Sequence, residues 1–408
     1  MNFDLTSEQA LIQTTVRDFA QAEIAPVAEE LDREHRFPYE LVAKLGELGL
    51  MGIPFPTEYG GGGADNLSYA LAIEELARVD ASVCITVAAH TSLGTQGIHL
   101  WGTSEQKDEW LPQLCSGRKL CAFGLTEPEA GSDAGNVKTT ATLDGDEWVI
   151  NGAKQFITNS GTDITGCVTI TALTGRNGNK EINGGGGGGS PPPSTPSHAG
   201  ASAYGDRKEI SNIIVPNGTP GYTQGEPYRK MGWNASDTRP LSFEDCRVPA
   251  GNLLGPRGDG FKQFLHLLDS GRIGIAAMGV GMAQGALDQA LAYAKERQAF
   301  GKPISKFQTI QAKLADLSAE IEAARLLTYK AAMLKDRKQN FTLTAAQAKL
   351  KTGRLAVRAT EEAVQIHGGY GYIEEYPVCR MYRDAKILTI GEGTDEVQQM
   401  VIARQLGC

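Results

Sequence analysis

A single carboxylate between two glycines is the feature of this sequence that most directly suggests chemistry. Glu392 lies in the stretch TIGEGTDEVQQ, between Gly391 and Gly393 and just before a helix-like segment. Glycines on both sides permit backbone conformations and close approaches that other residues resist. A solvated loop tip is the ordinary alternative for Gly-Glu-Gly. Whether Glu392 is a general base therefore depends on what the rest of the chain builds around it.

The bulk composition excludes several classes of protein. The chain has 408 residues, 41% of them hydrophobic, which is enough for two or three domains with a sizeable core. A formal net charge of -9 gives no electrostatic support for nucleic-acid binding. The sequence shows no secretory signal and no apolar run near the ~18 residues of a membrane span. We therefore expect a cytoplasmic protein without a membrane span.

The cysteines give no sign of a disulfide framework or a metal site. The seven cysteines are dispersed along the chain, and no two of them form a CxxC pair. An odd, scattered set of this kind is typical of reduced thiols in a cytoplasmic protein. We therefore expect neither disulfides nor a bound metal.

Helical patterns occupy the first part of the chain, residues 1–118. In SEQALIQTTVRDFAQAEIAPVAEELD, a helical spacing predicts one face made of Leu11, Thr15, Phe19 and Ala22. Farther on, Thr103 and Gln106 fit a capping box at the start of another helix.

Short β runs replace the helices in the middle part, residues 119–250. The segment TTATLDGDEWVING predicts two strands joined by an Asp-Gly turn, which is a strong hairpin signal. No helix-length segments alternate with the strands, so parallel βαβ units are not expected. Residues 183–206 combine a six-glycine run with a three-proline run, and the near-repeats NKEI and RKEI flank them. That composition predicts a flexible insertion in a β connection, with a functional loop as the alternative.

Long amphipathic helices return in the last part, residues 251–408. Apolar residues recur at spacings of four and three in the segment FQTIQAKLADLSAEIEAARLLTYKAA, at Ile310, Leu314, Leu317, Ile321 and Ala324. A second, alanine-rich segment follows it. The pattern predicts an antiparallel bundle of long helices.

Six sequence blocks, in order, resemble the acyl-CoA dehydrogenase family, and most closely its short-chain, butyryl-CoA-type members. They are CAFGLTEPEAGSDAG, NGAKQFITN, SDTRPLSFEDCRVP, ERQAFGKPISKFQTIQ, QIHGGYGY and RDAKILTIGEGTDEVQ. The resemblance covers nearly the whole chain except the Gly/Pro-rich segment. It implies an α+β fold with an N-terminal α-helical domain, a middle β-barrel-like domain and a C-terminal four-helix bundle. It also implies a homotetramer built as a dimer of dimers.

The reaction that the resemblance implies is FAD-dependent α,β-dehydrogenation of a saturated acyl-CoA to a trans-2-enoyl-CoA. The acyl group would be short- to medium-chain or branched, and the electrons would pass to electron-transferring flavoprotein. In the family, the base removes the α-proton, and its own backbone N–H holds the thioester oxygen together with a flavin ribityl hydroxyl. Because that proton is weakly acidic, the site must stabilise an enolate-like charge and raise the pKa of the base.

The resemblance assigns the base and the ligand-binding residues one by one. Glu392 is the expected base, because Gly271 stands at the position where some relatives carry theirs. The expected substrate-binding residues are Ser132, Asp269, Arg272 and Gly393. The expected FAD-binding residues are Phe123, Leu125, Thr126, Ser132, Phe156, Ile157, Thr158, Arg297, Phe300, Gln308, Gln365, Gly368, Gly369, Thr394, Asp395 and Glu396. Among these, Arg297 suits a diphosphate because its guanidinium can donate two parallel hydrogen bonds. No GxGxxG motif follows a strand, so a Rossmann site is not expected.

One departure from the family pattern and two other functions remain to be weighed. Relatives of the short- and medium-chain type usually have Tyr directly before the base, where this chain has Gly391. The missing ring should widen the pocket near the thioester. The alternatives are a flavoprotein monooxygenase or oxidase of the same fold, such as a nitroalkane oxidase, and a non-catalytic acyl-CoA-binding partner protein. The retained Glu392 and the intact flavin blocks argue against both.

Overall fold

The computed structural model describes residues 4–176 and 208–408, so the segment 183–206 lies outside the described residues. The N-terminal part is helical: α1 (Ser7–Phe19), the π-helix η1 (Ala20–Ile24), α2 (Ala28–Glu34), α3 (Tyr39–Glu47), α4 (Asn66–Ala77), α5 (Ala81–Ala89), the π-helix η3 (His90–Thr95), α6 (Gln96–Trp101) and α7 (Ser104–Cys115). Thr103 caps α7 through its predicted capping box with Gln106. The helical character of this part is confirmed.

The buried face of the first helix differs from the prediction. Leu11 is 66% exposed, and the buried apolar side chains are Val16, Ala20 and Ile24 instead. These three residues pack in the core that α1 shares with α4. Helical spacing alone identified a helix here, but several faces of it carry apolar residues, and only the contact with α4 decides which face is buried.

The middle part is a single sheet of eight strands: β1 (Leu120–Gly124), β2 (Thr140–Asp144), β3 (Glu147–Thr158), β4 (Thr165–Arg176), β5 (Lys208–Pro216), β6 (Tyr222–Gln224), β7 (Thr238–Pro249) and β8 (Leu253–Leu254). Their order is β6-β7-β3-β2-β4-β5-β8, and β1 also pairs with β4. The predicted β2–β3 hairpin is present, with Gly145 in the left-handed region at its turn. β1 runs parallel to β4 without a helical crossover, because the β2–β3 hairpin connects them.

Long helices form the C-terminal part: α8 (Gly260–Glu296), α9 (Gln308–Asp336), α10 (Thr342–His367), α11 (Pro377–Ala385) and α12 (Asp395–Leu406). The small strands β9 (Gln298–Ala299) and β10 (Lys302–Pro303) form a hairpin between α8 and α9. The predicted face of α9 is confirmed, since Leu317, Ile321 and Ala324 are buried and Ile310 and Leu314 pack against the same core.

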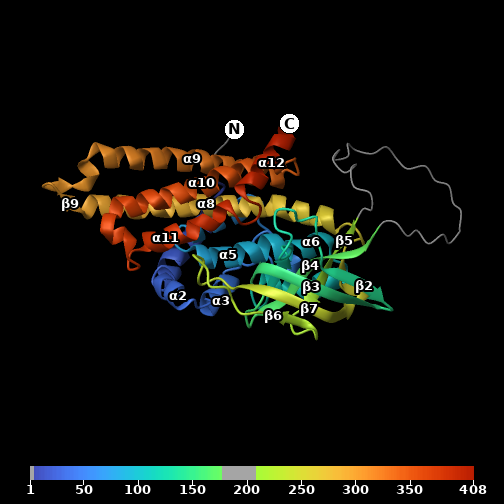
Figure 1. Ribbon diagram of the computed structural model, residues 1–408. Coiled ribbons are helices and arrows are strands. Elements are labelled where there is room, and N and C mark those ends of the chain that lie inside the picture. Colours follow the sequence, from blue (N-terminus) through green and yellow to red (C-terminus); the bar gives the residue numbers. More distant parts are fainter. Residues whose placement is uncertain (1–3, 177–207) are drawn as a thin grey trace.

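The three long helices lie side by side as a layer above the N-terminal helices and the sheet (Figure 1). The β9–β10 hairpin lies at the end of this layer away from the sheet, and α12 lies near the other end (Figure 1). The helix–sheet–helix order confirms the predicted fold class. The exact domain boundaries at 118/119 and 250/251 stay a prediction, and β8 lies just beyond the second of them. In the described part of the chain, no helix is long and apolar enough to cross a membrane.

Candidate active site

Glu392 lies in a tight turn between the 3-10 helix η7 (Lys386–Thr389) and α12. Its φ is +51° and that of Gly393 is +91°, so two consecutive residues adopt the left-handed conformation. Such a φ is unfavourable for a residue other than glycine, and persists where the surrounding structure enforces it. Thr394 then caps α12 by accepting a hydrogen bond from Val397 N (3.3 Å). The carboxylate therefore precedes the positive end of a helix of three turns.

Two side chains that the sequence analysis missed hold this turn in place. The Lys349 ammonium donates to the Gly393 carbonyl oxygen (2.6 Å), and Gln398 Nε2 donates to the same oxygen (3.0 Å). Gln398 Nε2 also reaches the Glu392 carbonyl oxygen (3.4 Å). Both carbonyls thus have donors, whereas the Glu392 N–H has no partner among the described residues. That N–H is free to bind the oxygen of a ligand.

The Glu392 carboxyl group is placed where its pKa must rise. Its Oε2 atom is sealed from solvent and has no hydrogen-bond partner in the described part of the chain, although the residue as a whole is partly exposed. Burial raises the pKa of Glu392 to about 7, and the charges of Lys349 and Arg272 only partly oppose this effect. A carboxylate with a pKa near neutrality is suited to accept a proton from a weak carbon acid.

Gly271 and Glu392 face the same point in space. A Cβ added at Gly271 would lie 2.2 Å from Glu392 Oε2 and 3.3 Å from a methyl group of Leu93. The helix position where the resemblance places the base of some relatives is thus directly opposite Glu392, the predicted base of this chain. A glycine at position 271 leaves room for the Glu392 carboxylate.

Asp269 and Arg272, both expected to bind substrate, pair with each other one turn apart on α8. Asp269 also accepts a hydrogen bond from Thr342 Oγ1 (2.7 Å). Arg272 is buried, and its Nε has no partner among the described residues. Because its charge acts on the Glu392 pKa, Arg272 lies near Glu392, and its role in binding the CoA arm stays a prediction.

The first sequence block expected to bind FAD, residues 123–132, begins in β1 and continues into the loop after it. Phe123 is the fourth residue of that strand, and the loop after it is tied to the end of β3, since Gln155 N donates to the Thr126 carbonyl (2.8 Å) and Lys154 Nζ donates to the Leu125 carbonyl (3.3 Å). Ser132 lies on an exposed part of the same loop. The structure thus brings this block next to the second one.

A buried ion pair fixes that loop, and the sequence analysis missed it. Lys154 Nζ lies 2.7 Å from Glu127 Oε1, and both side chains are almost wholly buried. Glu127 also accepts hydrogen bonds from the backbone N–H groups of Lys138 (2.6 Å) and Thr139 (3.1 Å). One signal was available in the sequence, because Lys154 lies four residues after Ile150, on the inward-facing side of the alternating strand β3.

The second flavin block forms the end of β3. Phe156 has a φ of +60° and is 65% exposed, with its ring 5.2 Å from that of Tyr228. Ile157 is buried in the core of the sheet, so only its backbone is open to a cofactor. Thr158 is half-buried and pairs with Thr238 on β7. An exposed aromatic ring held in an unusual backbone conformation is consistent with a flat ligand at this edge.

The π-helix η3 lies between the flavin blocks and the base. Its Leu93 side chain contacts the Gly271 position, and Gly94 packs so closely on the Cys121 carbonyl of β1 that a Cβ there would lie 2.4 Å away. Trp233 N, from the loop before β7, donates to Asp384 Oδ1 (2.6 Å) on α11, the helix before the base turn. The β1 and β3 edge and Glu392 therefore belong to one region.

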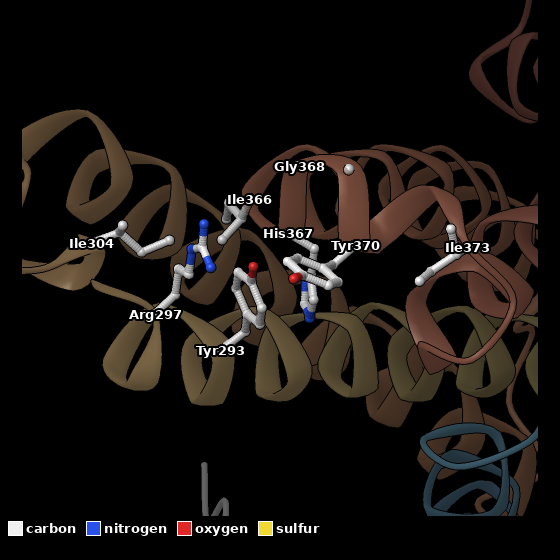
Figure 2. Close-up of a pocket in the computed structure, with 9 residues that line it drawn as sticks. Tyr293, Arg297, Ile304, Ile366, His367, Gly368, Tyr370 and Ile373 are labelled. Atoms are coloured by element: carbon white, nitrogen blue, oxygen red, sulfur yellow. The ribbon is translucent and has the colours of Figure 1, made fainter. Parts of the chain in front are cut away.

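A second group of expected FAD residues lies at the other end of the bundle. Arg297 ends α8, 25 positions after Arg272, so the two are about 38 Å apart along the helix axis. Figure 2 shows Arg297 and Tyr293 of α8 next to His367 and Tyr370, and the Tyr293 and His367 rings stack 4.2 Å apart. Beside these side chains lies an open hollow of about 540 Å³. The hollow is lined by Tyr293, Arg297, Ile304, Ile366, His367, Gly368, Gly369, Tyr370 and Ile373.

The Arg297 guanidinium lies 5.7 Å from the centre of the Tyr370 ring and has no ion-pair partner in the described part of the chain. Beside it, a Cβ at Gly368 or Gly369 would meet nothing within 4 Å, so the backbone of this turn is accessible. An unpaired guanidinium next to an open backbone turn is suited to an anionic group such as a diphosphate.

The remaining residues expected to bind FAD are divided between the two ends of the helical bundle. Phe300, at the tip of the β9–β10 hairpin, is 96% exposed, Gln308 begins α9, and Gln365 is exposed on the last turn of α10. Near the base, Asp395 pairs with Arg354 (2.8 Å) and Glu396 is exposed on the first turn of α12. One chain therefore separates the expected FAD residues into a group near Glu392 and a group near Arg297.

Three family models match successive parts of the chain. They describe the acyl-CoA dehydrogenase N-terminal domain (residues 6–118), the middle domain (residues 122–185) and the C-terminal domain (residues 258–407). The chain is 52% identical to a probable acyl-CoA dehydrogenase, YngJ, of Bacillus subtilis, with all of both chains covered. It is 45% identical, over all of both chains, to a short-chain specific acyl-CoA dehydrogenase of Clostridium acetobutylicum.

A solved structure shows the same fold. The butyryl-CoA dehydrogenase of Megasphaera elsdenii superposes with a TM-score of 0.90 at 44% identity, with all of both chains covered. The match in fold is thus accompanied by a full-length match in sequence. This chain belongs to the acyl-CoA dehydrogenase family.

Proposed function

We propose that this protein oxidises a short-chain acyl-CoA thioester to the 2-enoyl-CoA, with Glu392 as the base that removes the α-proton. The observation that carries the proposal is the buried, unpartnered Oε2 of Glu392, with a pKa of about 7, in a turn whose backbone N–H is also unpartnered among the described residues. The Oε2 atom and the N–H belong to one residue. A thioester whose oxygen accepts a hydrogen bond from this N–H therefore presents its α-carbon to the carboxylate.

The backbone of the turn stabilises the charge that develops when the proton leaves. The Glu392 N–H can donate to the thioester oxygen, and the N-terminus of α12 directly follows. Lys349 donates to the Gly393 carbonyl and Gln398 donates to the carbonyls of both Glu392 and Gly393, so the turn that presents the N–H is held in place. Burial excludes water that would otherwise compete for the proton.

FAD is the cofactor that the described residues fit. The exposed Phe156 ring and the loop after β1 suit the flat flavin ring. The unpaired Arg297 beside Gly368 and Gly369 suits the diphosphate. When bound, FAD supplies the acceptor for the hydride that leaves the β-carbon. Electron-transferring flavoprotein would then receive the electrons. In support, the chain is 43% identical, with a TM-score of 0.90, to a chain in a solved structure concerned with the electron-transferring flavoprotein of Acidaminococcus fermentans.

The proposal is tested by adding butyryl-CoA to the purified holoprotein without oxygen. The expected result is a yellow protein whose flavin absorbance is bleached, with crotonyl-CoA as the product. A flavoprotein that stays yellow with butyryl-CoA and with longer and branched acyl-CoA thioesters would contradict the proposal. A protein without flavin after expression with added riboflavin would contradict the cofactor assignment.

We further propose that each FAD site is completed by a second copy of the chain, within a homotetramer built as a dimer of dimers. The support is the separation of about 38 Å along α8 between Arg272 and Arg297, which is too large for one cofactor to contact both ends of the same chain. The exposed Phe300 on the β9–β10 hairpin offers an apolar contact beside Arg297.

Replacing Arg297 with alanine should therefore release FAD and lower the thermal stability of the protein, because a cofactor stabilises only the folded form to which it binds. The measurement is the ratio of flavin to protein after gel filtration, with the mass determined by light scattering. Lys295→Ala is the matched control, since Lys295 is an exposed cation on the same last turn of α8. A monomer that holds FAD tightly would rule out the shared site.

A further inference from the structure

Lys349 is a fully buried lysine whose ammonium contacts the turn that carries Glu392. It lies on α10 and donates to the Gly393 carbonyl oxygen over 2.6 Å. It forms no ion pair with any of the described residues. Burial lowers its pKa to about 8, so the ammonium is still mainly charged at neutral pH. Burying a charge without an ion-pair partner is costly, and packing alone does not require it.

The hydrogen bond to the Gly393 carbonyl does not by itself explain a lysine at this position. Gln398 Nε2 already donates to the same oxygen (3.0 Å), and it also reaches the Glu392 carbonyl (3.4 Å). The two peptide planes that follow Glu392 therefore have a donor on α12. Lys349 adds a second donor, which comes from another helix, and a positive charge that acts on the buried Glu392 carboxyl group.

Close packing of α10 on its neighbours fixes the place from which Lys349 reaches the turn. One helical turn after Lys349, a Cβ added at Gly353 would lie 2.8 Å from the Leu388 carbonyl oxygen of η7. A Cβ added at Gly279 of α8 would lie 2.9 Å from Thr352 Cβ. Helix α10 thus packs directly on the segment before the base and on α8, which faces the base. The distance between α10 and the turn therefore has little freedom.

Two cations favour the ionised form of the Glu392 carboxyl group. Burial raises its pKa to about 7, and the charges of Lys349 and Arg272, in that order, oppose the rise. Arg272 pairs with Asp269 on its own helix, whereas Lys349 donates to the base turn itself. Loss of the Lys349 charge should therefore raise the pKa of Glu392 further. Other titratable groups that interact with Lys349 or Glu392 are Tyr69 of α4 and, on the first turn of α12, Asp395 and Glu396.

We propose that Lys349 is a positioning residue for the base: it holds the turn from α10, so that the N–H and the carboxylate of Glu392 act on one thioester, and its charge keeps the carboxylate ionised. The proposal rests on the function proposed above. A hydrogen bond from the Glu392 N–H strengthens as negative charge develops on the thioester oxygen. A displaced turn therefore costs more in the transition state than in the bound substrate, and should lower the reaction rate more than the affinity.

The test follows flavin reduction by butyryl-CoA in the holoproteins Lys349→Met and Lys349→Gln, by stopped-flow absorbance without oxygen. Methionine removes the charge and the donor, whereas glutamine removes the charge and keeps an N–H donor. In both variants the midpoint of the pH profile of kcat/KM should move upward by about one pH unit. At saturating butyryl-CoA, Lys349→Met should be slower by about 10-fold to 100-fold, and Lys349→Gln should be less affected. The Kd for butyryl-CoA should change by less than about threefold.

Lys351→Met is the matched control, because Lys351 lies two positions away on α10 and pairs with Glu320 on the surface. It should keep the wild-type rate, affinity and pH midpoint. A purely structural Lys349 would lower thermal stability and flavin content but leave the pH midpoint of the remaining activity unchanged, and that result would overturn the proposal. Weaker binding of butyryl-CoA at an unchanged limiting rate would overturn it too. If the methionine variant does not fold, the pH midpoint of Lys349→Gln decides, and failure of both to fold would assign Lys349 to the fold alone.

The failure of this inference is distinguishable from failure of the proposed function. If butyryl-CoA reduces the wild-type flavin and the two Lys349 variants match the wild type in rate and pH midpoint, only the role of Lys349 is wrong. If no acyl-CoA reduces the wild-type flavin, the proposed function is wrong, and the inference fails with it.

Discussion

Replacement of Glu392 with glutamine is expected to leave FAD bound and to reduce the rate of flavin reduction by butyryl-CoA by a factor of about 10² to 10⁴. The amide has nearly the shape of the carboxylate but cannot accept the α-proton. The change also removes a carboxyl group whose pKa is raised to about 7 by burial. Because Oε2 has no hydrogen-bond partner among the described residues, the amide removes no hydrogen bond of that atom from the fold. The measurement is stopped-flow absorbance of the flavin without oxygen.

Glu374→Gln is the matched control for this experiment, because Glu374 is an exposed glutamate in the loop before α11. The control should reduce its flavin at the wild-type rate. A Glu392→Gln protein that keeps more than about a tenth of the wild-type rate would move the base to another residue.

Replacement of Lys154 with methionine is expected to lower the free energy of unfolding by about 3–5 kcal/mol and to weaken FAD binding. Burial lowers the pKa of Lys154 to about 8, so its ammonium is still charged at neutral pH. Burial opposes ionisation of Glu127 too, but the Lys154 charge and the hydrogen bonds outweigh it and lower the pKa of that carboxyl. Loss of the ammonium leaves a buried carboxylate without its counter-charge and frees the Leu125 carbonyl in the flavin loop.

The double variant Glu127→Gln/Lys154→Met separates the ion pair from the packing. Removing both charges should restore part of the stability, since most of the loss comes from an unpaired buried charge. Lys138→Met is the surface control, and should change stability by no more than about 0.5 kcal/mol because Lys138 is exposed. The measurements are urea unfolding and the flavin-to-protein ratio. A Lys154→Met protein with unchanged unfolding and flavin content would show that the pair neither stabilises the sheet nor fixes the loop.

The turn that holds Glu392, the predicted base, could be recognised from the sequence because its conformation requires particular residue types. Only glycine adopts a φ near +90° readily, so Gly393 marks the conformation that presents Glu392. Gly391 is different, because its φ is not positive. A Cβ added at Gly391 would meet only two Ile387 atoms, at 3.5 and 3.7 Å, so there is space for a side chain there. A larger residue at position 391 is therefore sterically possible, and the wider pocket expected from its absence stays a prediction.

The residues that support the base could not be predicted from sequence, because they depend on contacts between distant elements. Lys349 and Lys351 lie two positions apart on α10, yet the first is buried against the Gly393 carbonyl and the second forms a surface ion pair with Glu320. Nothing in the local pattern separates them. Lys335 is a similar case, since the helix α9 has several lysines and only the packing against α8 and η3 places this one beside Ser270 and Thr91 in the wall of a small cavity.

The fold was easier to predict from the sequence than the site, because it depends on patterns within each helix and strand. The Asp-Gly hairpin, the capping box at Thr103 and the apolar face of α9 are all local signals, and the structure has each of them. The face of α1 was predicted wrongly because Leu11 is apolar but exposed, and tertiary packing alone selects Val16. The parallel pairing of β1 with β4 has no local signal, because its partners are 46 residues apart at Cys121 and Cys167.

The most direct test of the central claim, that Glu392 is a buried base, is the pH dependence of kcat/KM for flavin reduction by butyryl-CoA. This quantity reports the ionisation of groups in the free enzyme. A base acts only when deprotonated, and burial raises the pKa of Glu392 from 4.5 to about 7. We therefore expect kcat/KM to rise about tenfold per pH unit below pH 7 and to level off above it. A kcat/KM that is already level at about pH 5 would be that of an ordinary solvated carboxylate, and would contradict the account.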